Sequence, residues 1–157
     1  MSNASPSAVG LQVPDFTLPA TGGEFQLSAL RGKSIVMYFY PKDSTPGCTT
    51  EAGQFRDLHG EFVKRNCAVF GISRDSLKSH ENFKAKLGLP FELITDADEI
   101  ACRLFDVIKT KNMYGKQVLG IERSTFLIDA EGRLHREWRK VKADGHAAEV
   151  LAALNAL

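Results

Sequence analysis

Cys48 is the residue of this chain whose position most clearly predicts chemistry. It follows a short loop, PKDSTPG, that begins where an apolar run ends at Pro41, and the residues after it have helical spacing. Cys48 is therefore expected at the start of a helix, where unpaired N–H groups and the helix dipole stabilise a negative charge. Because the thiolate is the reactive form of cysteine, this position predicts a nucleophile rather than an inert helix-start cysteine.

The residues just before Cys48 fit a nucleophilic site. Thr45 lies three positions earlier, so its hydroxyl can reach the sulfur or a substrate oxygen across the turn. Pro41 and Pro46 have no N–H donor and limit water in the pocket, and the fixed φ of Pro46 suits the entry to a helix. Gly47 completes the loop. A single proline in a loop usually has only a structural role, so these residues are consistent with the site but do not identify it.

The elements that must position this loop alternate between strands and helices. Apolar, β-branched and aromatic runs predict strands over 34–40, 67–72, 91–94 and 124–128, with 134–141 as the hairpin partner of the last. Helical spacing predicts helices over 49–65, from a cap at 75 or 76 to about 86, over 96–108 and over 145–157. This order predicts one α/β domain with a mixed sheet and helices on both faces.

Three segments carry more specific expectations. Residues 11–30 hold short apolar alternations broken by proline and glycine, which predicts a hairpin-rich N-terminal section. In the helix over 96–108, the expected buried stripe is Ile100, Leu104, Phe105 and Ile108. Residues 109–120 are expected to form a loop.

Length and composition place the chain among ordinary globular proteins. It has 157 residues, of which 43% are hydrophobic and 25% charged, which suits one domain over 11–157 after a flexible leader over 1–10. The net charge of +1 offers no global field for nucleic acid or an anionic membrane, and no apolar run approaches the ~18 residues of a membrane span. The leader lacks the pattern of a secretory signal, so a cytoplasmic location is expected.

The segments around Cys48 and Arg123 resemble one known family. The pattern Pro41-x-x-x-Thr45-x-x-Cys48 is similar to the peroxiredoxin signature, and FYPKDSTPGCTTE and GIERSTFLID resemble its bacterioferritin comigratory protein (BCP/PrxQ) subfamily. The similarity runs from about Pro14 to the C-terminus. It implies a thioredoxin-like fold, with a central mixed β-sheet flanked by helices and an N-terminal hairpin extension. It also implies a thiol peroxidase that uses no metal or cofactor.

The resemblance gives each site residue a role. Cys48 would be the peroxidatic cysteine, which attacks a peroxide and becomes a sulfenic acid, and Thr45 would bind the peroxide. Arg123, which is otherwise a surface residue at a strand end, would hold the thiolate and stabilise charge on the departing oxygen. Glu51 could orient the site or simply place a favourable charge in the first helical turn, and both possibilities stay open.

The chain departs from the family where the sulfenic acid must be returned to a thiol. The two usual positions of a resolving cysteine hold Gly53 and Lys84. Cys67 opens a buried-type strand, and Cys102 is expected off the apolar stripe and partly exposed, so both are weak candidates with a structural role expected. This predicts a one-cysteine cycle, resolved by an external thiol of thioredoxin, glutaredoxin or glutathione type. The resemblance to the subfamily also implies a monomer. The alternative is a peroxide sensor or binding protein on the same fold, with little turnover.

Other cysteine chemistries fit less well. A thioredoxin-type motif would need a cysteine at Glu51, and a cysteine phosphatase would need an arginine at Gln54. A cysteine hydrolase needs a histidine partner, but no motif surrounds any of the four histidines, which are expected to be solvated: His59, His80, His135 and His146. No cysteine or histidine pair has zinc-ligand spacing.

Overall fold

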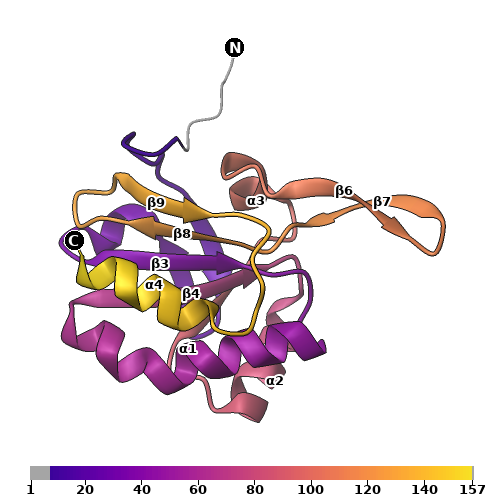
Figure 1. Cartoon of the computed structure of the whole chain (residues 1–157), viewed down its shortest axis with the longest axis horizontal. Coiled ribbons are helices and arrows are strands. Elements are labelled where there is room, and N and C mark those ends of the chain that lie inside the picture. Colours follow the sequence, from indigo (N-terminus) through magenta and orange to yellow (C-terminus); the bar gives the residue numbers. More distant parts are fainter. Residues whose placement is uncertain (1–7, 157) are drawn as a thin grey trace.

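A seven-stranded mixed sheet forms the centre of the computed structural model, which describes residues 8–156 (Figure 1). The strand order is β2-β1-β5-β4-β3-β8-β9. The pairs β3–β4 and β4–β5 are parallel, and the other pairs in this sheet are antiparallel. The strands are β1 (Thr17–Ala20), β2 (Gly23–Gln26), β3 (Ser34–Phe39), β4 (Cys67–Ser73), β5 (Glu92–Thr95), β8 (Ser124–Ile128) and β9 (Leu134–Trp138).

Helices cover the two faces of the sheet unequally. Figure 1 shows α1, α2 and α4 against one face and α3 at the other. The helices are α1 (Pro46–Lys64), α2 (Leu77–Leu87), α3 (Ile100–Leu104) and α4 (His146–Asn155), with a 3-10 helix, η1, at Leu27–Leu30. In residues 8–156 no helix is both long and apolar enough to cross a membrane.

Alternate residues of β3 face two different apolar cores, as the period of two in a strand requires. Val36 and Tyr38 pack in the core beneath α1, α2 and α4, whereas Met37 and Phe39 pack in the core beside α3. All four side chains are buried, so β3 is the doubly covered strand that its apolar sequence predicts. Cys48 belongs to the first of these cores.

The N-terminal segment forms the predicted hairpin from β1 and β2, which joins the main sheet where Ala20 pairs with Ile94 of β5. Just before it, residues 8–13 lie beside β9. The Gly10 N–H donates to the Leu134 carbonyl at 2.7 Å, and the Leu134 N–H donates to the Leu11 carbonyl at 2.9 Å. Residues 1–7 of the predicted leader, and Leu157, lie outside the described residues.

The prediction of a loop over 109–120 is wrong. This segment forms a second, two-stranded antiparallel sheet from β6 (Ile108–Met113) and β7 (Lys116–Ile121), which projects away from the domain in Figure 1. Tyr114 (φ 54°) and Gly115 (φ 79°) form the turn between the strands. Two consecutive residues with positive φ are the requirement of a tight hairpin turn, and the Tyr-Gly pair was the signal for it.

The predicted helix over 96–108 is also much shorter than expected. The chain is helical only over α3, which is a little more than one turn, and Ile108 belongs to β6. The side chain of Ile100 is exposed, while that of Cys102 is fully buried, so the expectation of a partly exposed Cys102 is wrong. The Asp96 carboxylate accepts the N–H groups of Ile100 and Cys102 and turns the chain so that Cys102 faces the core.

Candidate active site

Cys48 lies at the carboxyl end of β3, as the third residue of α1. Thr45 is the N-cap residue and Pro46 the first helical residue, so the chain enters the helix as the proline predicts. Only 1% of Cys48 is exposed. The sulfur is therefore closed off from bulk solvent while it sits in the helix turn whose N–H groups favour an anion.

Arg123 brings a guanidinium to this sulfur. Its Nη2 donates to the Cys48 Sγ at 3.4 Å, across 75 residues of sequence. Arg123 directly precedes β8, whose first residue, Ser124, pairs with Phe39 at the end of β3. The antiparallel register of β3 and β8 therefore places Arg123 beside the start of α1. The carbonyl of Arg123 also accepts the Val141 N–H at 3.0 Å, which fixes its backbone.

Glu51 holds the other side of the same guanidinium. The Arg123 Nη1 donates to the Glu51 Oε1 at 2.6 Å, and Glu51 is fully buried one helical turn after Cys48. Burial raises the pKa of Glu51 to about 7, although the charge and hydrogen bond of Arg123 act in the opposite direction. Of the two roles that the sequence left open, this contact supports Glu51 as a residue that orients Arg123.

Gly47 leaves room for the guanidinium. A Cβ atom on this residue would lie 3.1 Å from the Arg123 Nη2, tighter than most real contacts of a Cβ atom. Sequence pattern alone indicates no reason for a glycine here beyond a loop, because the close approach comes from a residue far along the chain.

Thr45 and the two prolines lie in the loop and the first turn of α1 that lead to Cys48. The Thr45 hydroxyl donates to the Lys42 carbonyl at 2.9 Å, so its oxygen is left to accept a hydrogen bond from another group. No hydrogen bond joins Thr45 to Cys48 in the part of the chain that the structure describes. Pro41 is half-buried, and Pro46 is exposed. The structure thus brings Cys48, Arg123, Glu51 and Gly47 into contact, with the remaining predicted residues around them.

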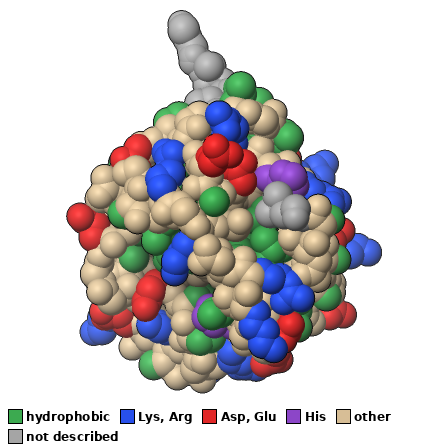
Figure 2. Space-filling view, turned by 90° about the vertical axis from the view of Figure 1, so that its left-hand side faces the viewer, with side chains coloured by type: hydrophobic (Ala, Val, Ile, Leu, Met, Phe, Trp, Pro, Cys, Tyr) green, Lys and Arg blue, Asp and Glu red, His purple; other side chains and the backbone are tan. Residues whose placement is uncertain are grey.

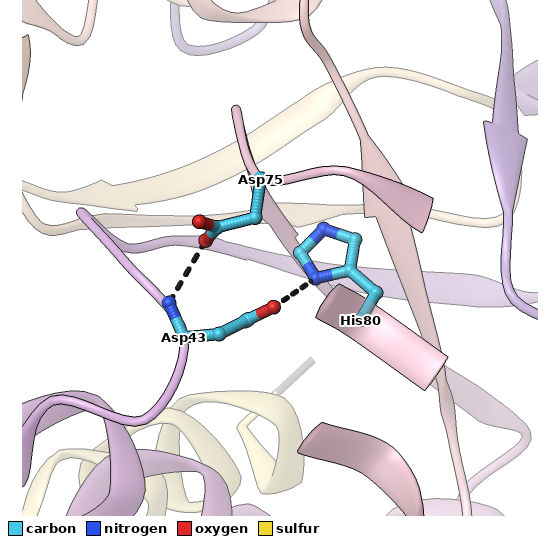
Figure 3. A group of neighbouring side chains, drawn as sticks. All are labelled: Asp43, Asp75 and His80. Carbon is cyan, nitrogen blue, oxygen red and sulfur yellow. Dashed lines mark hydrogen bonds and ion pairs between the residues drawn. The ribbon is translucent and has the colours of Figure 1, made fainter. Parts of the chain in front are cut away.

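A buried polar cluster beside the loop was missed by the sequence analysis (Figure 3). Asp43, two residues before Thr45, contacts His80 of α2, and the Asp43 N–H donates to the Asp75 Oδ2 at 2.8 Å. The prediction that the histidines are solvated is wrong for His80 and His146, which are 0% and 2% exposed. One signal was available. Asp43 and Asp75 each follow a buried parallel strand, and the carboxyl ends of parallel strands meet at one edge of the sheet.

Asp43, Asp75 and His80 also offer one ligand atom each within 4.8 Å of one another, the spacing of a metal site. These candidate ligand atoms already make hydrogen bonds within the protein. The Asp75 Oδ2 accepts from Ser73 as well as from Asp43, and the two ring nitrogens of His80 contact the Asp43 carboxylate and the Ile94 carbonyl. The cluster therefore works in this structure as a polar anchor between segments.

The other two cysteines lie away from Cys48. Cys67 pairs with Ser34, at the far end of β3 from the site, and burial raises its pKa to about 12. Figure 2 looks onto this far end, where Lys, Arg, Asp and Glu side chains are interspersed. Cys102 packs in the core on the opposite face of the sheet, and burial, with the nearby Asp96, raises its pKa well above the usual range.

The chain matches the model of the AhpC/TSA family over residues 9–136. It is 59% identical over 143 residues to Peroxiredoxin Bcp of Xanthomonas campestris, covering 90% of this chain and 89% of that protein. It is 52% identical over 147 residues to Peroxiredoxin Bcp of Bacillus subtilis, covering 93% and 94%.

Solved structures resemble the fold closely. A structure of Xanthomonas campestris Peroxiredoxin Q has a TM-score of 0.86 at 59% identity and covers 90% of each chain. A structure of the Xanthomonas campestris bacterioferritin comigratory protein, described in terms of its alkyl peroxide reduction activity, has a TM-score of 0.89 at 56% identity and covers 95% of this chain and 98% of that one. These neighbours, together with the mixed sheet and its flanking helices, confirm the predicted thioredoxin-like fold.

Proposed function

Since the chain belongs to the AhpC/TSA family as a peroxiredoxin of the Bcp type, and is therefore a thiol-dependent peroxidase, we propose that Cys48 alone carries its redox cycle. In this proposal an external thiol, and no second cysteine of the chain, returns the oxidised sulfur to its reduced form. The observation that carries the proposal is the placement of Cys67 and Cys102 away from Cys48.

The first half-reaction is an attack of the Cys48 thiolate on one oxygen of a hydroperoxide. The sulfur–oxygen bond forms as the oxygen–oxygen bond breaks, and the departing oxygen takes a proton to leave as water or an alcohol. Arg123 donates to the sulfur from a fixed position, so its charge stabilises the thiolate and the charge that develops on the departing oxygen. Glu51 holds the guanidinium in place from the other side, and Thr45 offers a hydroxyl beside the sulfur for the bound peroxide.

The second half-reaction consumes two external thiols. The first condenses with the Cys48 sulfenic acid to give a mixed disulfide and water, and the second attacks this disulfide to release the Cys48 thiol and an external disulfide. We assign the reductant to the thioredoxin, glutaredoxin or glutathione type, the substrates to hydrogen peroxide and organic hydroperoxides, and the working form to a cytoplasmic monomer. The alkyl peroxide reduction described for the Xanthomonas campestris relative supports the organic substrates.

The strand register supports the absence of an internal partner. Cys67 lies beside the first residue of β3 and Cys48 follows the last, so five strand steps, or ~16 Å, separate their ends of the sheet. Cys102 lies across the sheet from Cys48, in the other apolar core. A disulfide requires Cα atoms within ~7 Å, so neither cysteine can pair with Cys48 without a large rearrangement of the fold.

Intact mass after one equivalent of peroxide tests the proposal. We expect a species one oxygen atom heavier than the reduced protein, which dimedone traps at Cys48, and then many turnovers with excess thiol. A species two hydrogen atoms lighter, mapped to Cys48 with Cys67 or Cys102, would show that one of these resolves the sulfenic acid. Consumption of only about one equivalent of peroxide with every reductant type would instead indicate a sensor.

A further inference from the structure

The two half-reactions make opposite demands on the segment that carries Cys48. Attack on a peroxide needs the sulfur held against Arg123. Reduction by an external thiol needs the sulfur to meet a second, larger molecule, yet Cys48 is 1% exposed. If the one-cysteine cycle proposed above holds, the loop over 41–45 and the first turn of α1 must be firmly placed in one step and released in the next.

We propose that Asp43 and His80 are positioning residues that form a clasp between this loop and α2, and that the strength of the clasp sets the balance between the two half-reactions. Neither residue touches the sulfur or Arg123. They act on the reaction through the backbone that leads from Asp43 to Thr45 and Cys48.

Asp43 is fastened by both its side chain and its backbone (Figure 3). Its Oδ1 accepts from the Tyr40 hydroxyl at 2.6 Å, and its Oδ2 accepts from the Ser79 hydroxyl at 2.9 Å and contacts the His80 Nδ1 at 2.7 Å. Its N–H donates to Asp75, at the turn before α2. Although burial alone would raise it, these hydrogen bonds hold the pKa of Asp43 below its ordinary value.

His80 makes the clasp an ion pair. Its Nδ1 faces the Asp43 carboxylate, and its Nε2 faces the Ile94 carbonyl at 3.0 Å. Both partners are acceptors, so both ring nitrogens must carry a proton and the ring is an imidazolium. The side chains of His80 and Asp43 are 0% and 2% exposed. A buried pair of this kind is stable while both charges are present. Removing one partner is strongly destabilising, because the other charge is then buried without a partner.

The clasp lies next to a strained residue. Ser44, between Asp43 and Thr45, has φ of 65°, a left-handed conformation that a serine adopts only when its surroundings impose it. This residue sets the direction in which the chain leaves the clasp and enters α1 at Pro46. Release of Asp43 would let Ser44 relax, and Thr45 and the first turn of α1 would shift with it. The strain therefore favours opening, and the ion pair opposes it.

The test measures the two half-reactions separately in Asp43→Asn, His80→Gln and the double variant. The first is the loss of the Cys48 thiol with hydrogen peroxide. The second is the loss of the sulfenic acid with dithiothreitol, with its rate of dimedone labelling measured in parallel. In each single variant we expect the first rate to fall on the order of tenfold and the second to rise severalfold. The double variant, which leaves no unpaired buried charge, should recover part of the first rate.

Two further variants keep the test decisive. Ser79→Ala removes one hydrogen bond to Asp43 and leaves both charges, so it should move both rates in the same directions by smaller factors, even if the charge variants fail to fold. Leu154→Ala, in α4, opens a space in the core beneath the helices without touching the loop and should leave the balance of the two rates unchanged. If the rates of both half-reactions fell together, or if neither rate changed, the proposed role of the clasp would be wrong.

Discussion

Gly47 and Arg123 approach so closely that the space beside the guanidinium is the space a side chain on residue 47 would fill. A Cβ atom there would lie 3.1 Å from Nη2, the nitrogen that donates to Cys48. The missing side chain of Gly47 thus helps to position the Arg123 Nη2 as a donor to Cys48.

Gly47→Ala should slow the reaction of Cys48 with peroxide severalfold without lowering the melting temperature. The helix tolerates alanine, which favours helix over glycine by ~1 kcal/mol, but the guanidinium must shift by a few tenths of an ångström. Gly60→Ala is the matched control, because it lies in the same helix with nothing within 4 Å of its added Cβ. Equal rates for the two variants would show that Arg123 does not depend on this space.

Cys48→Ser should abolish peroxide consumption, whereas Cys67→Ser and Cys102→Ser should keep most of it. Only Cys48 combines the start of a helix with a donor from Arg123. The measurement is peroxide loss with dithiothreitol as the reductant. Near-normal turnover by Cys48→Ser would refute the assignment of the nucleophile.

Arg123→Ala should slow the peroxide reaction by at least about tenfold, since the loss of one preorganised donor costs ~3–4 kcal/mol of barrier in comparable sites. Arg123→Lys should restore only part of the rate, because it supplies the charge without the planar pair of donors that reaches both Cys48 and Glu51. Arg123→Ala should also slow the alkylation of Cys48 at neutral pH, because the guanidinium that donates to the sulfur is gone. An unchanged alkylation rate would place Arg123 outside the site.

Glu51 should make the fold less stable as the pH rises from about 4.5 to about 7. Burial raises its pKa from 4.5 to about 7, so the folded state binds this proton more tightly than the unfolded state. The resulting stability is fully present below about pH 4.5 and is lost as the pH rises through about 7, by on the order of 3 kcal/mol. In a Cys48→Ser background, Glu51→Gln should remove this slope from the free energy of unfolding between pH 5 and 8.

Glu61→Gln serves as the control, because Glu61 lies on the same helix but is only half-buried, with a pKa lowered by its hydrogen bonds to Lys64 and Arg65. It should leave the slope across neutral pH in place. If Glu51→Gln and Glu61→Gln give the same slope, the buried carboxyl is ionised throughout this range.

Gly53→Cys or Lys84→Cys should create an intramolecular disulfide with Cys48 after one equivalent of peroxide. Gly53 lies on α1, five residues after Cys48, and Lys84 lies on α2, where its side chain pairs with Glu92 at 2.7 Å. The disulfide requires the first turn of α1 to unwind, so its appearance also measures how readily that turn opens. Persistence of a trappable sulfenic acid in both variants would show that the turn stays closed on the time scale of oxidation.

The parts of the fold that the sequence predicted are those set by local pattern. The buried run of β3 and the helical spacing after Cys48 depend on neighbouring residues, and both were found. The β6–β7 hairpin was missed because its exposed strands alternate weakly, so only the Tyr114–Gly115 turn marked it. Cys102 was misplaced because a one-turn helix is too short for a periodic stripe to indicate its buried side.

The same distinction between local pattern and distant contacts holds for the residues of the candidate site. Cys48 could be identified from its place at the start of a helix, whereas Arg123 came only from the family resemblance, since 75 residues separate it from the sulfur. The pairing of Asp43 with His80, and the space left by Gly47, depend on contacts between distant segments. No periodicity or spacing along the chain predicts contacts of that kind.

The three cysteines are buried in different parts of the fold, so their accessibility can report on how the chain unfolds. Cys67 lies in the core beneath α1, α2 and α4, and Cys102 in the core beside α3; Cys48 shares the first core with Cys67 but lies where the loop meets α1. A thiol-counting reagent added along a denaturant series should therefore register three separate events. Release of the loop uncovers one sulfur, and loss of each layer from its own face of the sheet uncovers another. The order in which the counts appear is the order in which the domain comes apart.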